Sequence, residues 1–222
     1  MNNFSNNFQK GFSAKKSLGQ NFLHAPHIVG KMVHEVGVEK SSIVLEVGPG
    51  KGVLTRGLLD VGAKVIAVEK DDRAIGFLAE KFAPKIATGQ LTVIHQDVLE
   101  FEPSSAGLIS GNYLIAANIP YYITGEFLRK FLETDCPPKR MILMLQKEVA
   151  KRIVGEESGG NGKKPKTIKE SILSISVKAY GVPKYIVTVP ARHFRPVPKV
   201  DSALILIDTI SKTFFSATAD AT

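Results

Sequence analysis

The feature that most restricts the possible folds is an apolar run followed directly by a glycine-rich turn and then by a helical stretch. Residues 43–47 (IVLEV) lead into residues 48–52 (GPGKG), and apolar side chains then recur at helical spacing over 53–61. A strand, a glycine turn and a helix in this order open a doubly wound α/β sheet. The sequence therefore predicts an α/β fold with a ligand site beyond the carboxyl ends of its strands.

The same alternation of apolar runs and helical stretches continues along the chain. Strands are predicted at 64–68, 91–94, 113–117 and 141–145, and helices at 26–36, 74–82, 127–132 and 168–179. The last two predicted strands, 185–189 and 200–207, are joined by too few residues for a crossover helix, so we expect them to be antiparallel. The pattern predicts a Rossmann-like fold of the methyltransferase type, with a mostly parallel seven-stranded sheet, helices on both faces and a final antiparallel hairpin.

The chain length and the lack of an internal repeat or linker predict one folded domain with a tail at each end. A chain of 222 residues can bury one sizeable core, and no repeat or linker divides it. We expect a mobile tail at 1–14, a methyltransferase-type catalytic domain at 15–208 and a second tail at 209–222. Within the domain, the aperiodic segment 15–23 and the polar segment 155–166 are predicted to be surface loops.

The balance of charge favours a polyanionic partner. The chain has 29 Lys and Arg against 21 Asp and Glu, which gives a net charge of +8. The basic residues gather in three places, which are Lys10, Lys15 and Lys16, then Lys163, Lys164, Lys166 and Lys169, and finally Arg192, Arg195 and Lys199. Such clusters are typical of proteins that bind nucleic acid, although a soluble protein that is simply basic shows the same balance.

Cysteine and histidine usage argues against two other kinds of protein. Cys136 stands alone, so no disulfide can form within the chain, and no continuous apolar stretch has the length of a membrane span or the form of a signal peptide. We therefore expect a cytoplasmic protein. The five histidines lack the spacing of metal ligands with cysteine or a second close carboxylate, so no metal site is predicted.

Polar residues at three successive strand ends predict a pocket for an adenosine compound. Gly48 and Gly50 let the backbone turn tightly and approach a ligand. Glu69 follows Gly50 by 19 residues (69 − 50), the spacing at which a carboxylate binds both hydroxyls of a ribose. Asp97, after the third strand, is placed to accept from the exocyclic amino group of adenine. Each residue alone has an ordinary structural role, as a turn or a helix cap, but the ordered set of three favours a binding site.

The positions of the glycines indicate which adenosine compound binds. A dinucleotide fingerprint requires glycine at its first, third and sixth positions, but the sixth position counted from Gly48 is Val53. A phosphate loop requires Gly-Lys-Ser/Thr, but Lys51 is followed by Gly52. S-adenosylmethionine carries a sulfonium and an amino acid in place of phosphates, and it fits a glycine turn preceded by an acid such as Glu46. The predicted cofactor is therefore S-adenosylmethionine.

A second functional stretch, NIPY at 118–121, follows the fourth predicted strand. The side-chain oxygen of Asn118 and the carbonyl of Ile119, held by Pro120, can accept the two hydrogens of an adenine amino group, which turns the nitrogen lone pair toward a methyl donor. Tyr121 offers a ring on which an unpaired or flipped base can stack, or else it is ordinary packing under the next helix. For Phe194 two roles stay open, covering the opposite face of the base or packing in the core.

Six short motifs occur in order between about residues 15 and 207. They are 20–23 (QNFL), 46–50 (EVGPG), 68–70 (VEK), 96–98 (QDV), 118–121 (NIPY) and 194–203 (FRPVPKVDSA). Together they resemble the small-subunit ribosomal RNA adenine dimethyltransferases, the kasugamycin-resistance type. The first and last motifs are specific to that family, whereas the glycine turn by itself is not.

The resemblance implies an activity, a partner and further site residues. Such enzymes transfer methyl groups from S-adenosylmethionine to N6 of two adjacent adenosines near the 3′ end of small-subunit rRNA, each of which receives two, and release S-adenosylhomocysteine. The expected partners are this rRNA and the pre-assembled small ribosomal subunit, with no membrane, and we expect a monomer that acts in ribosome biogenesis. By the same resemblance, the cofactor-binding residues are Gln20, Asn21, Leu23, Gly48, Gly50, Glu69, Asp97, Val98 and Asn118.

Two other functions stay open at this point. One is an adenine N6-methyltransferase of large-subunit rRNA, of the macrolide-resistance type, against which the 194–203 motif argues. The other is a non-catalytic relative that binds S-adenosylmethionine and RNA, against which the intact stretch 118–121 argues.

The sequence departs from the family in two places. Family members usually continue into a small helical domain, and we expect most of that domain to be absent because this chain ends soon after its last predicted strand. Residues 155–169 are longer and more basic than the compact loop usual there, and they are predicted to be an additional RNA contact.

Overall fold

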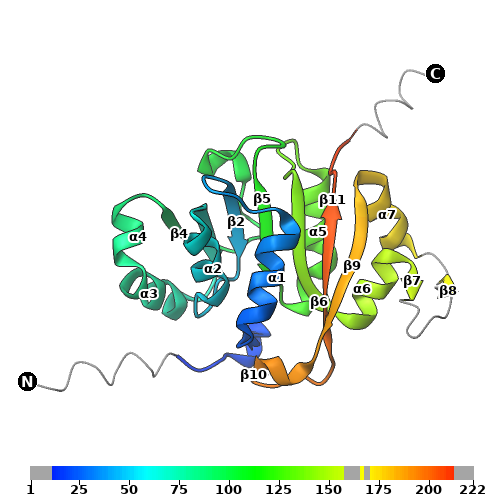
Figure 1. The fold of residues 1–222 in the computed structure, drawn as a ribbon, viewed down its shortest axis with the longest axis horizontal. Coiled ribbons are helices and arrows are strands. Elements are labelled where there is room, and N and C mark those ends of the chain that lie inside the picture. Colours follow the sequence, from blue (N-terminus) through cyan, green and yellow to red (C-terminus); the bar gives the residue numbers. More distant parts are fainter. Residues whose placement is uncertain (1–11, 158–165, 168–170, 213–222) are drawn as a thin grey trace, which may run out of the picture.

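The computed structural model describes residues 12–157, 166–167 and 171–212. Its main feature is a sheet of seven strands in the order β4-β3-β2-β5-β6-β11-β9 (Figure 1). These strands are β2 (Ile43–Val47), β3 (Lys64–Glu69), β4 (Leu91–His95), β5 (Leu114–Asn118), β6 (Arg140–Gln146), β9 (Val182–Val189) and β11 (Ser202–Asp208). The first five are parallel to one another, whereas β11 is antiparallel to both β6 and β9. The predicted α/β fold with an antiparallel final pair is confirmed.

Helices cover both faces of this sheet. One apolar cluster joins the sheet to α1 (Pro26–Val36), α2 (Val53–Val61) and α3 (Asp72–Lys81), with the short α4 (Ala83–Ala87) at its edge. A second cluster joins the other face to α5 (Thr124–Glu133), α6 (Lys147–Val154) and α7 (Ile172–Tyr180). Short 3₁₀ turns complete the fold at η1 (Lys16–Leu18), η2 (Pro103–Ala106), η3 (Tyr121–Ile123) and η5 (Ala191–His193).

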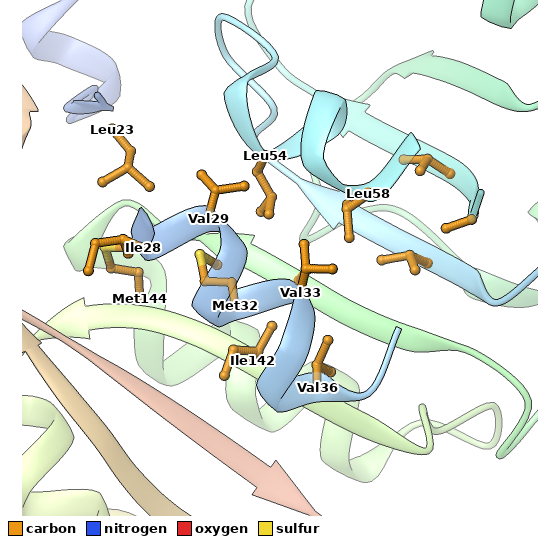
Figure 2. Close-up of a cluster of buried hydrophobic side chains, with 14 of the residues drawn as sticks. Leu23, Ile28, Val29, Met32, Val33, Val36, Leu54, Leu58, Ile142 and Met144 are labelled. Carbon is orange, nitrogen blue, oxygen red and sulfur yellow. The ribbon is translucent and has the colours of Figure 1, made fainter. Parts of the chain in front are cut away.

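Helix α1 shows how the sequence pattern produces this packing. Its buried residues recur every three or four positions, and Figure 2 shows Val29 and Val33 facing Leu54 and Leu58 of α2. Proline is tolerated in the first turn because its missing N–H would have no partner there. The helix ends at Gly37, which has a φ of 77° and caps the last turn in the left-handed conformation.

The segment 15–23 is not the surface loop that we predicted. It contains η1 and the two-residue strand β1 (Phe22–Leu23), which pairs antiparallel with β10 (Phe194–Arg195). Phe22 and Leu23 are both buried, because they close the space between the glycine turn and α1. Upstream of this segment, Phe12 makes edge contacts with the rings of Phe22 and Phe77 at centroid distances of 5.4 and 5.8 Å.

The region 155–166 differs in its described part from the predicted loop. Strand β7 (Glu156–Glu157) pairs antiparallel with β8 (Lys166–Thr167), while Lys163, Lys164 and Lys169 lie outside the described residues. The tails predicted at 1–14 and 209–222 also fall mostly outside them. Among the helices that the structure describes, none is both long enough and apolar enough to span a bilayer.

Candidate active site

A cavity of about 310 Å³ opens at the carboxyl ends of β2, β3, β4 and β5. Strand ends that are far apart in sequence meet there because the four strands are parallel. The predicted site residues that line it are Gln20, Asn21, Gly48, Gly50, Glu69, Asp97, Val98, Asn118, Ile119, Pro120 and Tyr121. The predicted cofactor residues and the predicted reacting stretch therefore share one cavity.

The floor of the cavity is the glycine turn after β2. Gly48 and Gly50 have φ angles of 66° and 53°, in the left-handed region that side chains with a Cβ rarely adopt. A Cβ at Gly50 would lie 2.9 Å from two ring carbons of Phe22, so any other residue would force the Phe22 ring to shift. This turn therefore presents bare backbone to the cavity.

Glu69 stands at the end of β3 with its carboxylate held by three backbone N–H groups. Gly50 donates to Oε2 at 3.1 Å, while Lys70 and Asp71 each donate to Oε1 at 2.9 Å. Burial raises the pKa of Glu69, and these hydrogen bonds oppose the rise. The contact with Gly50 fixes the carboxylate beside the glycine turn, where a ribose hydroxyl pair would be bound.

Asp97 follows β4 and is held from two sides. Its Oδ1 accepts from the backbone N–H of Leu99 at 3.0 Å, and its Oδ2 pairs with the Lys70 ammonium at 2.5 Å. Burial works to raise the pKa of Asp97, but the hydrogen bonds from Lys70 and Leu99 outweigh it and keep the pKa below its ordinary value. The Asp97 carboxylate is thus an ionised hydrogen-bond acceptor on the cavity wall.

The reacting stretch begins where β5 ends. The side-chain amide of Asn118 donates from Nδ2 to the backbone oxygen of Asn21 at 3.0 Å, which leaves Oδ1 as the acceptor of that side chain. Pro120 then turns the chain into η3, with Tyr121 half-buried on the cavity wall and Tyr122 63% exposed at its rim. Burial raises the pKa of the Tyr121 hydroxyl, which keeps it a neutral phenol.

Asp71 is a site residue that sequence reasoning missed. It is buried, caps the first turn of α3 and binds the Arg73 guanidinium through both oxygens at 2.9 and 2.6 Å. It also accepts from the side chain of Gln20 at 2.8 Å, and Arg73 in turn donates to the backbone of Ser13 at 3.0 Å. These bonds hold the segment before β1 over the cavity. The signal was available, because an aspartate just before an apolar helical run is a typical N-cap.

Two of the predicted site residues, Phe194 and Leu23, do not line the large cavity. Phe194 is 1% exposed and belongs to the core cluster under α1, in register with Leu23 across the β1–β10 pair. Of the two roles left open for Phe194, packing in the core is the one this structure shows. Leu23 is 7% exposed and borders a separate cavity of about 30 Å³ instead of the large one.

Glu46, the acid before the glycine turn, does not reach the large cavity. It is 1% exposed and borders the small cavity, and neither carboxyl oxygen has a hydrogen-bond partner among the described residues. Burial raises the pKa of Glu46 to about 8, so the side chain carries its proton at neutral pH. No group of three or more metal-ligating side chains occurs within the ranges that the structure covers.

Comparison with known proteins shows that the chain is similar to RNA-modifying enzymes. Residues 11–219 match the family described as ribosomal RNA adenine dimethylase. Proteins named ribosomal RNA small subunit methyltransferase A are similar: that of Dehalococcoides mccartyi strain BAV1 is 40% identical over 194 residues, and that of Enterococcus faecalis 41% over 199. These alignments cover 87% and 88% of this chain but only 62% and 64% of the relatives, so the chain spans less than two thirds of their length.

Solved structures of similar fold include two enzymes above 25% identity. The 23S rRNA methyltransferase ErmE superposes with a TM-score of 0.71 at 27% identity, over 86% of this chain and 71% of its own. A dimethyladenosine transferase from Plasmodium falciparum superposes with a TM-score of 0.70 at 29% identity, over 90% of this chain and 66% of its own.

Proposed function

Because this chain belongs to the ribosomal RNA adenine dimethylase family, we propose that it transfers methyl groups from S-adenosylmethionine to N6 of adenosines in small-subunit rRNA. The proposed targets are two adjacent adenosines near the 3′ end, each of which receives two methyls. The observation that most directly supports this proposal is that Glu69 and Asp97 line the same cavity as Asn118 and Tyr121.

The residues of the cavity suit S-adenosylmethionine, which supplies an electrophilic methyl group on a sulfonium when it is bound. The left-handed turn at Gly48 and Gly50 accepts close contact from a ligand because no Cβ fills the space. Glu69 would bind the ribose hydroxyls, and Asp97 the adenine amino group. Asn21 and Val98 line the same cavity and would complete the contacts with the cofactor.

The reacting stretch suits an adenine amino group. The Oδ1 of Asn118 and the carbonyl of Ile119 would accept its two hydrogens, which withdraws the nitrogen lone pair from the ring and directs it to the methyl group. The nitrogen becomes acidic as its bond to carbon forms, so its proton can pass to water without a strong base. Catalysis then rests on placement and electrostatics.

The segment before β1 contributes to this placement. Its Asn21 carbonyl fixes the amide of Asn118, and its Gln20 is tied to Asp71. The orientation of the Asn118 side-chain amide thus depends on the same segment that covers the cofactor side of the cavity. In this proposal, residues from both halves of the site therefore act together.

The target adenine has to be unpaired or flipped to reach Tyr121, whose half-buried ring offers a stacking face. The partners proposed for this chain are small-subunit rRNA and the pre-assembled small subunit, with the protein acting as a monomer in the cytoplasm. The basic residues at 155–169 are proposed to contact RNA, as their charge alone suggests.

Radiolabelled methyl transfer to two substrates tests this function. Incubation with assembling small subunits should label the rRNA, whereas naked large-subunit rRNA should stay unlabelled. Label in the large-subunit rRNA only would favour an activity like that of the 23S rRNA methyltransferase ErmE, to which the chain is also similar. Tight binding of S-adenosylmethionine without transfer to either substrate would identify a non-catalytic relative.

A further inference from the structure

The hydroxyl of Tyr121 is bound by a side chain from the other end of the chain. Tyr121 Oη lies 2.9 Å from the Oγ of Ser202, which is 81 residues away in the sequence. Ser202 is fully buried and does not line the cavity, whereas Tyr121 does. Any effect of Ser202 on a bound base must therefore pass through the tyrosine ring.

Ser202 is fixed more firmly than its partner. It is the first residue of β11 and pairs with Gln146 of β6 on one side and with Val189 of β9 on the other. The preceding residue, Asp201, accepts from the backbone of Lys147 at 3.1 Å and, through its side chain, from the backbone of Ala191 at 3.0 Å. Two strand pairs and two further hydrogen bonds thus hold the serine in place.

Tyr121 has no comparable support of its own. It opens η3, a turn of three residues, and its side chain is only partly buried. Its backbone oxygen accepts from Thr124, but this bond does not fix the direction of the side chain. A hydrogen bond at the far end of the ring restricts χ1, because rotation about χ1 would carry Oη away from its partner.

We propose that Ser202 is a positioning residue that fixes the direction of the Tyr121 side chain, so that the target adenine stacks on the ring in line with the methyl donor. This proposal rests on the proposed function for the identity of the base, but the tyrosine–serine contact exists without it. The serine is the one buried hydroxyl in β11, a strand whose following residues, 203–207, are all buried and apolar. A strand that served packing alone would need no hydroxyl at that position.

Ser174 provides a matched control. It is also fully buried, but its Oγ donates to the backbone oxygen of Ile153 at 3.0 Å in the contact between α6 and α7. Ser174→Ala removes a buried hydroxyl of the same kind without touching the cavity. A loss that appears in Ser202→Ala and not in Ser174→Ala is therefore specific to the tyrosine contact.

The first test is a double-mutant cycle on methyl transfer by the full chain. Ser202→Ala and Tyr121→Phe should each lower kcat about fivefold, the rate equivalent of one buried neutral hydrogen bond, with unchanged affinity for S-adenosylmethionine. The double variant should be no slower than either single variant, because both changes remove the same bond. Wild-type kcat in Ser202→Ala, or losses that multiply to about 25-fold, would overturn the proposal.

The second test needs no activity, so it separates this proposal from the proposed function. Wild-type protein labelled at tyrosine should show a single χ1 rotamer for Tyr121 in NMR coupling constants, and Ser202→Ala should give averaged χ1 couplings while Ser174→Ala does not. If the wild type methylates no RNA but the χ1 couplings respond as expected, the proposed function fails and the positioning contact stands. Identical χ1 couplings in all three proteins would refute the positioning contact.

Discussion

The buried carboxyl of Glu46 makes the stability of the fold depend on pH. Glu46 belongs to β2, and both its carboxyl oxygens are buried without a hydrogen-bond partner in the part of the chain that the structure describes. Burial, and to a smaller extent the neighbouring charge of Glu69, raises the pKa of Glu46 from 4.5 to about 8. At neutral pH the folded protein therefore keeps a proton on Glu46 that the unfolded chain has released.

The sign and size of the effect follow from proton linkage. Below pH 4.5, the ordinary pKa of a glutamate side chain, both states carry the proton, and the full contribution to stability is present. Between that pH and about 8 only the folded state carries it, so the free energy of unfolding falls by about 1.4 kcal/mol per pH unit. From about pH 5.5 to about pH 7 the loss amounts to roughly 2 kcal/mol.

Glu46→Gln isolates this contribution because the amide is neutral at every pH. Urea unfolding of both proteins in matched buffers, at about pH 5.5 and about pH 7, gives the difference in their free energies of unfolding. All other titrating groups are common to the two proteins and cancel to first order. The difference should shift by roughly 2 kcal/mol, with the wild type losing stability relative to the variant as pH rises. Parallel pH profiles would refute a protonated Glu46.

Three further substitutions test the cavity and its support, and a fourth, Gly76→Ala, is a control. Asn118→Ala should leave cofactor affinity unchanged by calorimetry and slow single-turnover methyl transfer about a hundredfold or more, whereas normal transfer would remove Asn118 from the mechanism. Gly50→Ala, which sets a Cβ 2.9 Å from Phe22 at positive φ, should cost about 1–2 kcal/mol of stability and weaken cofactor binding. Gly76→Ala, with nothing within 4 Å, should be neutral or stabilising in the same denaturation assay, and equal losses in both would contradict this reasoning. Asp71→Ala removes a helix cap and the bond that holds the segment before β1, so that segment should become more sensitive to protease; unchanged cleavage would count against the role.

Elements with a strong period could be predicted from the sequence. The helix predicted at 26–36 has the bounds of α1, because its buried positions, its first-turn proline and its final glycine all report the same local geometry. The strands of the parallel sheet were predicted within about two residues for the same reason. Helix α6 was missed although Ala150, Ile153 and Val154 are buried at helical spacing and Gly155 follows, so its signal was present.

Elements that depend on distant partners could not be predicted. Strand β1 has two residues, too few to show a period, and it exists because Leu23 meets Phe194 across the fold. The same contact places Phe194 in the core, a choice between packing and function that an isolated aromatic residue does not reveal. Short strands of this kind are defined by tertiary contacts and not by local propensity.

The residues of the candidate site also include some that the sequence could locate and some whose contacts it could not show. Glu69, Asp97 and Asn118 could be located because strand ends in a parallel sheet converge on one edge. The sequence could indicate Asp71 as a helix cap, but its bond to Gln20, like the bond between Ser202 and Tyr121, depends on contacts that only the folded chain forms. Sequence reasoning thus found the residues that line the cavity better than those that hold the lining in place.

The central claim is that residues 118–121 present an adenine amino group to the methyl of S-adenosylmethionine. The most direct test is mass spectrometry of small-subunit rRNA after incubation with this chain and the cofactor, with Asn118→Ala in parallel. The wild type should convert two adjacent adenosines near the 3′ end to N6,N6-dimethyladenosine, and the variant should leave them unmodified. Methyl groups on another atom or another base, or equal modification by the variant, would contradict the claim.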